Sequence, residues 1–294
     1  MKLTHSRAVL LMIAVTLMWS IAGVVTRHLE SARSFEVTFW RSFFTLLSLL
    51  VILPLFQGRE VFSRIRHAGR FLWISGVCWS VMFTAFMLAM TMTTVANVLI
   101  TLALGPFLTA LVARVTIGHR IPPRTWLAIA VAGAGIAWMY GSQVSLGGGL
   151  APFAGTLVAL LVPMAAAANW TVVQRSQAHG EKIDLVPAVL VGAAISSLVT
   201  LPLAFPFAAT GRDLGLLALL GLVQLAIPCV LSVMCARVLK APEIALLALL
   251  EIIFGILLAW AGAGEVPATS VLTGGSLVIG ALVANEWMGW RRRT

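Results

Sequence analysis

The sequence predicts an all-α polytopic membrane protein of ten transmembrane helices, arranged as two inverted five-helix repeats with both termini cytoplasmic. Three observations predict this fold class: the composition, ten apolar stretches of spanning length, and an uneven distribution of basic residues. Of the 294 residues, 60% are hydrophobic and 10% are charged, and the mean hydropathy is +1.02. Soluble domains of this size carry more charge, so most of the chain is expected to lie in a bilayer.

Ten stretches are long and apolar enough to cross a bilayer, which takes about 20 helical residues. The first follows Lys2 and Arg7, like the core of a signal peptide, but it is too long for one and no clear cleavage site follows. We therefore interpret it as a transmembrane helix. The stretches are 8–26, 36–56, 69–90, 95–115, 124–141, 150–173, 185–207, 213–235, 243–263 and 270–288.

The basic residues fix the expected orientation. With ten spans, 16 of the 20 Lys and Arg residues fall on the side of the two termini, three fall on the opposite side, and Arg41 lies inside the second span. Loops that stay in the cytoplasm collect such residues, so both termini are expected there. The net charge of +10 is spread over short loops, and we expect no nucleic-acid partner.

An even division of ten spans gives two halves of five. Because five is odd, the second half must enter the membrane in the opposite orientation, which is the inverted repeat of many transporters. We expect the first repeat at 1–141, a glycine-rich linker at 142–149 and the second repeat at 150–294. A faint echo between the halves aligns Leu104 with Leu250 and His119 with Glu265.

Two charged side chains inside spans are candidate substrate-binding residues. Glu251 lies near the middle of the ninth span, where an ionisable group costs a few kcal/mol and marks a functional site by default; the alternative is a protonated Glu bonded to a neighbouring helix. Arg41 would hold a substrate carboxylate through paired hydrogen bonds. Its alternatives are to reach outward to water or to pair with Glu36, and the sequence slightly favours the ion pair.

The other candidates are an aromatic residue and four neutral polar residues. Trp19 would stack on an aromatic or cationic substrate, or else pack against apolar neighbours. An amide inside a membrane either bonds a neighbouring helix or faces a wet cavity. Each of the four neutral polar residues, taken alone, fits a hydrogen bond between helices. Their occurrence in spans 4, 6 and 8 is compatible with one shared cavity. They are Asn97, Thr101, Asn169 and Gln224.

Prolines within spans 4, 6 and 8 are candidate hinges. Each removes a backbone donor and frees a carbonyl. They would serve alternating access, or simply curve their helices. These residues are Pro106, Pro163 and Pro228.

Signals for enzymatic chemistry are absent. The three cysteines lie in apolar segments without metal-ligand spacing, and the five histidines form no cluster. No phosphate-binding loop and no nucleophile–base pair is visible. We expect no metal, no cofactor and no enzyme activity.

These features together resemble the EamA-type transporters of the drug/metabolite transporter superfamily, over essentially the whole chain. The first repeat carries Leu17–Ser20 (LMWS) and Arg41 in FWRSFF. Each family repeat tends to have Glu-Pro in its fourth helix and to end it with Gly-Glu. Here Pro106 follows a glycine, whereas Glu251 and Glu265 keep the acidic positions of the second repeat.

The resemblance implies a secondary transporter that exports small metabolites, often amino acids, across the bacterial inner membrane. Within the family the chain is most similar to the aromatic amino acid exporter branch. The resemblance leaves open whether the protein is a monomer or a homodimer. Two other functions are the alternatives, an intramembrane lipid-modifying enzyme and a passive metabolite channel. An enzyme of that kind needs clustered carboxylates, His or Cys at one depth, and Glu251 alone does not supply them.

Overall fold

The computed structural model describes residues 4–32, 34–58, 60–66, 69–117, 122–145, 151–178, 186–236, 238–239 and 241–291. Within these ranges the regular structure is helical, without strands. The elements are α1 (His5–Arg27), α2 (Ser34–Gln57), α3 (Glu60–Arg66), α4 (Arg70–Met92), α5 (Val95–Leu102), α6 (Gly105–Ile117), α7 (Pro123–Ser145), α8 (Ala151–Ala178), α9 (Val186–Ala204), α10 (Gly211–Leu219), the π-helix η1 (Leu220–Ala226), α11 (Ile227–Ala236), α12 (Ala241–Ala263) and α13 (Thr269–Arg291).

Helices occupy every stretch that the hydropathy predicts. Six of them, among the described residues, are long and apolar enough to cross a membrane. Helical structure is expected there because a lipid-exposed backbone must satisfy its own hydrogen bonds. The six are His5–Arg27, Ser34–Gln57, Arg70–Met92, Val95–Val112, Pro187–Ala204 and Gly211–Ser232, and three shorter apolar helices are Ala154–Asn169, Leu250–Ala263 and Thr269–Asn285.

The fourth stretch is not the single helix that the sequence predicts. It divides into α5 and α6, with a turn at Ala103–Leu104. Pro106 has no N–H for the carbonyl of Leu102, so the α-helical bond at that step cannot form. The proline therefore lies at a break in the helix.

The eighth stretch is also interrupted. Between α10 and α11 the chain forms the π-helix η1 over seven residues. Pro228 follows two residues later and cannot donate to the carbonyl of Gln224. A π-helical segment holds one extra residue, which is common at functional sites.

The predicted linker 142–149 is only partly described. Its first residues, 142–145, continue α7, and 146–149 lie outside the described residues.

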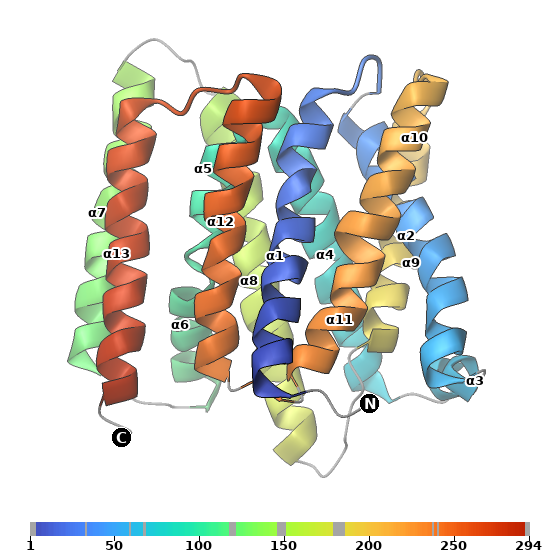
Figure 1. Cartoon of the computed structure of the whole chain (residues 1–294), viewed down its shortest axis with the longest axis horizontal. Coiled ribbons are helices and arrows are strands. Elements are labelled where there is room, and N and C mark those ends of the chain that lie inside the picture. Colours follow the sequence, from blue (N-terminus) through green and yellow to red (C-terminus); the bar gives the residue numbers. More distant parts are fainter. Residues whose placement is uncertain are drawn as a thin grey trace.

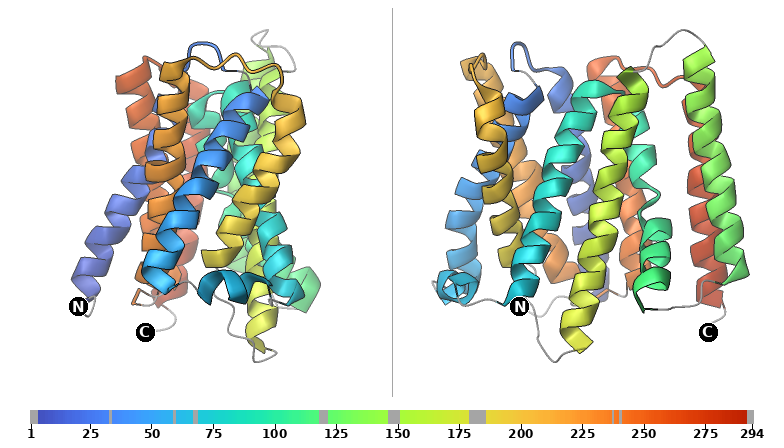
Figure 2. Two further views of the ribbon diagram at one scale, coloured as in Figure 1. Left: turned by 90° about the vertical axis from the view of Figure 1, so that its right-hand side faces the viewer. Right: turned by 180° about the vertical axis from the view of Figure 1, so that it is seen from behind.

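The helices stand side by side in one bundle (Figures 1 and 2). The start of α1 and the end of α13 lie at the same end, which we call the terminal end, and the opposite end is the distal end (Figure 1). α7 reaches the distal end, so α8 starts there and runs opposite to α1 (Figure 1).

Small residues allow several of these helices to approach closely. α4 packs on α8 and α9, α1 on α12, α2 on α9, and α7 on α13. A Cβ added at Gly192 of α9 would come within 2.4 Å of the Trp79 Cβ on α4, and one at Gly135 of α7 within 2.7 Å of the Gly274 carbonyl oxygen on α13. Glycines at these crossings bring backbones together, which matters in lipid because packing rather than the hydrophobic effect joins helices.

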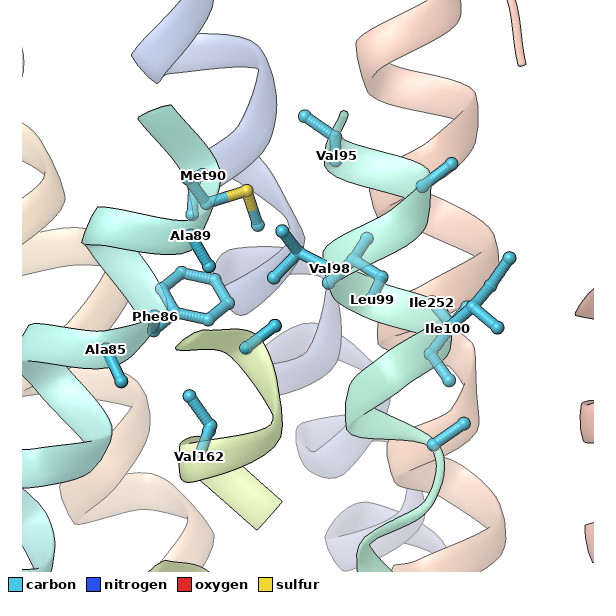
Figure 3. Packing of buried hydrophobic residues seen from close by; sticks show 14 of the residues in the cluster. Ala85, Phe86, Ala89, Met90, Val95, Val98, Leu99, Ile100, Val162 and Ile252 are labelled. Atoms are coloured by element: carbon cyan, nitrogen blue, oxygen red, sulfur yellow. The ribbon is translucent and has the colours of Figure 1, made fainter. Parts of the chain in front are cut away.

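The largest buried apolar cluster fills the space between α4, α5, α8 and α12. Its members include Phe86 and Met90 of α4, Leu99 of α5, Val162 of α8 and Ile252 of α12 (Figure 3). This cluster packs α5 against α8 and α12.

Candidate functional site

Arg41 is a buried charged group inside the bundle. It lies about 10 Å along α2 from the start of that helix, and only 1% of it is exposed. Its Nη1 donates to Oε1 of Gln224 at 3.1 Å, and its Nη2 donates to the carbonyl oxygen of Phe83 at 3.2 Å. Both acceptors are neutral.

The guanidinium of Arg41 is incompletely satisfied. Its Nε is buried without a hydrogen-bond partner, and among the described residues no carboxylate pairs with it. The guanidinium carbon lies 5.7 Å from the ring centre of Phe83 and 5.6 Å from that of Phe86, within the range of cation–π attraction. A cation in such surroundings costs free energy unless an anion completes them.

The expected ion pair between Arg41 and Glu36 is wrong. Both oxygens of Glu36 accept from the backbone N–H of Ala208, and Oε1 also accepts from that of Ala209. Residues five apart on a helix point about 140° away from each other, so these side chains face different neighbours. Arg41 does not reach outward either, because its side chain ends inside the bundle.

Gln224 positions Arg41 from the π-helix. Its Oε1 accepts from Arg41, and its Nε2 lies 3.5 Å from the carbonyl oxygen of Trp19 on α1. The amide thereby joins α1, α2 and η1 at one depth. The ring of Trp19 packs on an apolar cluster of α1 and α11 that includes Met12 and Cys235, so the contact of Trp19 with this site is made by its backbone.

Glu251 lies close to the same centre. Cys229 on α11 is within electrostatic range of both Arg41 and Glu251, which places the three groups around one region. The Glu251 side chain is half-buried and has no hydrogen-bond partner among the described residues. We call Arg41, Gln224, Cys229 and Glu251 the central cluster.

Three hydroxyl groups beside the central cluster were not predicted. The Ser196 Oγ of α9 lies 2.9 Å from the Ser42 Oγ of α2 and 2.9 Å from the Thr84 Oγ1 of α4. Ser42 adjoins Arg41, so this trio lies on the α9 side of the cluster. Serine and threonine are common inside membrane helices, and only the register between α2, α4 and α9 brings these three together.

Asn97 lies away from the central cluster, in a cavity at the distal end. Its Nδ2 donates to Thr93 Oγ1 at 2.9 Å, and Thr101 donates to the Asn97 carbonyl oxygen one turn further along α5. The cavity has a volume of about 440 Å³. We call it the distal cavity; its lining is Arg27, Thr91, Met92, Thr93, Thr94, Asn97, Glu265, Val266, Pro267, Ala268 and Val271.

Asn169 lies towards the terminal end instead. Its Oδ1 accepts from the Ser75 Oγ at 2.6 Å, which joins α8 to α4. The amides of Asn97, Asn169 and Gln224 therefore lie at three levels rather than in one shared cavity. Sequence reasoning could place them in spans but had no measure of their depth relative to one another.

The three candidate hinge prolines fall at two places. Pro163 is buried inside α8, and a Cβ at Gly105, the first residue of α6, would lie 3.9 Å from the Pro163 Cβ. The break before Pro106 thus packs against Pro163. Pro228 is separate, at the end of the π-helix that carries Gln224.

A metal centre has no ligand set in the described part of the chain, where no three His, Cys, Asp or Glu side chains gather. The three cysteines, Cys78, Cys229 and Cys235, are buried free thiols.

Comparison with known proteins gives a family match over the first part of the chain and a shared fold. Residues 6–141 match the EamA-like transporter family. No curated protein sequence matches the chain. Among solved structures, one crystal structure of a protein is 18% identical and aligns with a TM-score of 0.65 over 98% of this chain and 99% of that chain. At that identity the likeness shows a shared fold.

Proposed function

We propose, on the premise that the chain is a member of the EamA-like transporter family over residues 6–141, that it is a secondary transporter exporting small metabolites across the bacterial inner membrane. Amino acids are the proposed substrates, aromatic ones included. The proposed mechanism is alternating access of two inverted halves.

The pairing of helices supports two inverted halves. A two-fold rotation that relates the two halves would exchange each helix with its counterpart. The exchanged pairs would be α1 with α8, α2 with α9, α4 with the α10–α11 run, α5 and α6 with α12, and α7 with α13. The contact of α4 with α8 then becomes that of α1 with α11, and the contact of α6 with α8 becomes that of α1 with α12; all four are present. The contacts of α2 with α9 and of α7 with α13 map onto themselves, as they would across a two-fold axis.

The charge distribution supports the orientation. The terminal end holds the start of α1 and the end of α13, and most Lys and Arg residues belong to the loops of that side. By the preference of such loops for the cytoplasm, the terminal end would be cytoplasmic and the distal end external.

Arg41 carries the proposal for the substrate. A buried guanidinium with an unpartnered Nε and no acidic partner among the described residues is suited to receive a carboxylate from outside the protein. The rings of Phe83 and Phe86 beside it offer apolar surface for an uncharged side chain. A small molecule with a carboxylate and an apolar or aromatic portion fits this arrangement.

Glu251 would provide the second charged contact. Its carboxyl has no hydrogen-bond partner among the described residues and interacts electrostatically with Cys229, as Arg41 does. It would bind the substrate's ammonium group or take up the coupling proton. In either role it belongs to the same central cluster.

Counterflow into proteoliposomes tests this function. Proteoliposomes that contain the purified protein are loaded with unlabelled amino acids. A panel of labelled amino acids is then added outside, with and without a pH gradient. Saturable exchange of at least one amino acid is expected, because a carrier binds its substrate in each cycle. Non-saturable flux would point to a channel, and product formed from labelled lipid would point to an enzyme; either result would contradict the proposal.

A further inference from the structure

The distal cavity is bounded by an ion pair that the proposed function does not use. Arg27, the last residue of α1, donates from Nε to Oε2 of Glu265 at 2.6 Å. Glu265 lies in the connection between α12 and α13. Both residues line the cavity, and their side chains are 27% and 18% exposed, so water reaches the pair.

This pair holds four parts of the chain together at the distal end. Arg27 Nη1 donates to the Met90 carbonyl oxygen and Nη2 to that of Thr93, both at 2.7 Å, at the end of α4. The second oxygen of Glu265 accepts from the backbone N–H of Val95 at 2.7 Å, at the start of α5. A carboxylate there also faces the positive end of the α5 dipole. Breaking the Arg27–Glu265 bond would release the α12–α13 connection from α1.

Apolar side chains are packed between the distal cavity and the central cluster. Leu99 projects from α5 and is 2% exposed (Figure 3). A Cβ added at Gly255 of α12 would lie 2.4 Å from Leu99 Cδ1 and 3.7 Å from the Ser20 Cβ of α1. The Leu99 side chain therefore packs on Gly255 of α12, at a place where α12 also meets Ser20 of α1.

Only a short distance along the helix axes separates the distal cavity from the central cluster. Gly255 is one helical turn from Glu251, which is about 6 Å along the axis. Ser20 directly follows Trp19, whose carbonyl oxygen lies 3.5 Å from Gln224 Nε2. Movement of α1 away from α12 would open a path past Leu99 from the central cluster to the cavity.

We propose that Arg27 and Glu265 form the latch of a gate at the distal end, and that Leu99 is the plug which the latch holds in place. This inference rests on the proposed transport function. In the present conformation the latch is closed, and release of the pair lets α1 and α12 separate so that substrate passes between the central cluster and the distal cavity. Because water reaches the pair, its bonds are exchanged for hydration when it opens, and the pair can close again.

A matched control pair exists at the same end. Arg212 of α10 pairs with Glu30 of the α1–α2 connection, with side chains 60% and 46% exposed. Neither residue lines the distal cavity. Removing this pair changes the same kind of charge at the same end without touching the proposed latch.

The rate of thiol labelling measures the opening of the gate without any substrate. The Leu99→Cys variant in lipid nanodiscs is treated with a charged maleimide, and the unsubstituted protein gives the blank for Cys78, Cys229 and Cys235. Adding Glu265→Gln is expected to speed labelling at position 99 by about tenfold, the usual size of a coupling between sites. Adding Glu30→Gln instead, which removes the carboxylate of the control pair, is expected to leave the rate within about twofold. Equal rates in all three proteins would overturn the latch.

Cross-linking tests the same gate during transport. Cysteines at positions 27 and 265, joined by a reversible bis-methanethiosulfonate reagent, are expected to lower counterflow at least about tenfold, with recovery on reduction. Full counterflow in the joined protein would overturn the gate. If the unsubstituted protein shows no counterflow, the transport proposal fails, and the labelling rates alone decide whether the latch exists.

Discussion

Arg27 of α1 and Arg41 of α2 are two arginines with opposite surroundings. Arg27 bonds a carboxylate and two backbone carbonyl oxygens at 2.6 to 2.7 Å and keeps contact with water. Arg41 is 1% exposed, bonds two neutral oxygens at 3.1 and 3.2 Å, and leaves its Nε unpartnered. Arg27, which is better solvated, thus has an anionic partner in Glu265. The buried Arg41 has no anionic partner among the described residues.

The difference separates a structural contact from a binding site. A guanidinium with all its partners in the protein stabilises one conformation, as we propose for the latch. A buried guanidinium that lacks an anion has free energy to gain from one, and a substrate carboxylate supplies it. The four predictions below alter this contrast, in order of expected effect.

Removing the buried cation should have the largest effect. Arg41→Gln is expected to lower the affinity for a carboxylate substrate by about 100-fold, because truncating one partner of a buried charge pair costs about 3 kcal/mol. Counterflow at a series of substrate concentrations measures this loss. Arg212→Gln, which removes an exposed cation, is the matched control, and equal kinetics in the two variants would refute a special role for Arg41.

Neutralising Glu251 should abolish coupling and spare the fold. In Glu251→Gln the amide keeps the size of the side chain but cannot bind or release the coupling proton. We expect flux to stop responding to a pH gradient, while the elution volume in size-exclusion chromatography stays unchanged. Full activity at every pH would exclude Glu251 as the coupling or substrate-binding carboxylate.

Giving Arg41 an anion of its own should make it resemble Arg27. Gln224→Glu places a carboxylate where Oε1 now accepts from Arg41 at 3.1 Å. The new ion pair competes with the substrate, and we expect affinity to fall at least about tenfold while the variant remains folded. Gln224→Met, which removes the acceptor without adding charge, is the control. A higher affinity in Gln224→Glu than in the parent would contradict the assignment of Arg41 to a substrate anion.

Crowding the helix contact beside Arg41 should have the smallest effect on transport and a measurable one on stability. A Cβ at Gly221 of η1 would lie 2.8 Å from the Thr45 backbone nitrogen and 2.9 Å from the Phe44 carbonyl carbon. Gly221→Ala is therefore expected to lower the free energy of unfolding by about 1–3 kcal/mol. Thermal denaturation in detergent measures the change. Gly280→Ala, which meets open space, should leave the midpoint unchanged.

The positions of the helices could be predicted from the sequence because the bilayer imposes one simple condition, a long apolar segment. Both interruptions escaped that reasoning. The break at Ala103–Leu104 and the π-helix η1 keep the hydropathy of a continuous span, and Pro106 and Pro228 are as compatible with a gentle bend as with a break. Hydropathy measures transfer of side chains and is blind to how backbone bonds are arranged.

The central cluster was predicted in part. Arg41, Gln224 and Glu251 are conspicuous because polar groups are costly in lipid. Their partners depend on helix rotation and on depth, and these are fixed by packing between distant segments. The Glu36 pairing could have been rejected from helical geometry alone, because a spacing of five residues puts the two side chains on different faces. Phe83, Phe86 and the latch residue Arg27 carried no comparable signal.

The central claim is that Arg41 binds the carboxylate of the substrate, and a cycle of two changes tests it most directly. The affinities of an exchanged amino acid and of its carboxamide are measured by competition in counterflow, in the parent and in Arg41→Gln. The carboxamide should bind about 100-fold more weakly than the amino acid to the parent, and the two should bind equally to the variant. The same preference for the carboxylate in both proteins would contradict the claim, because that preference would then arise elsewhere.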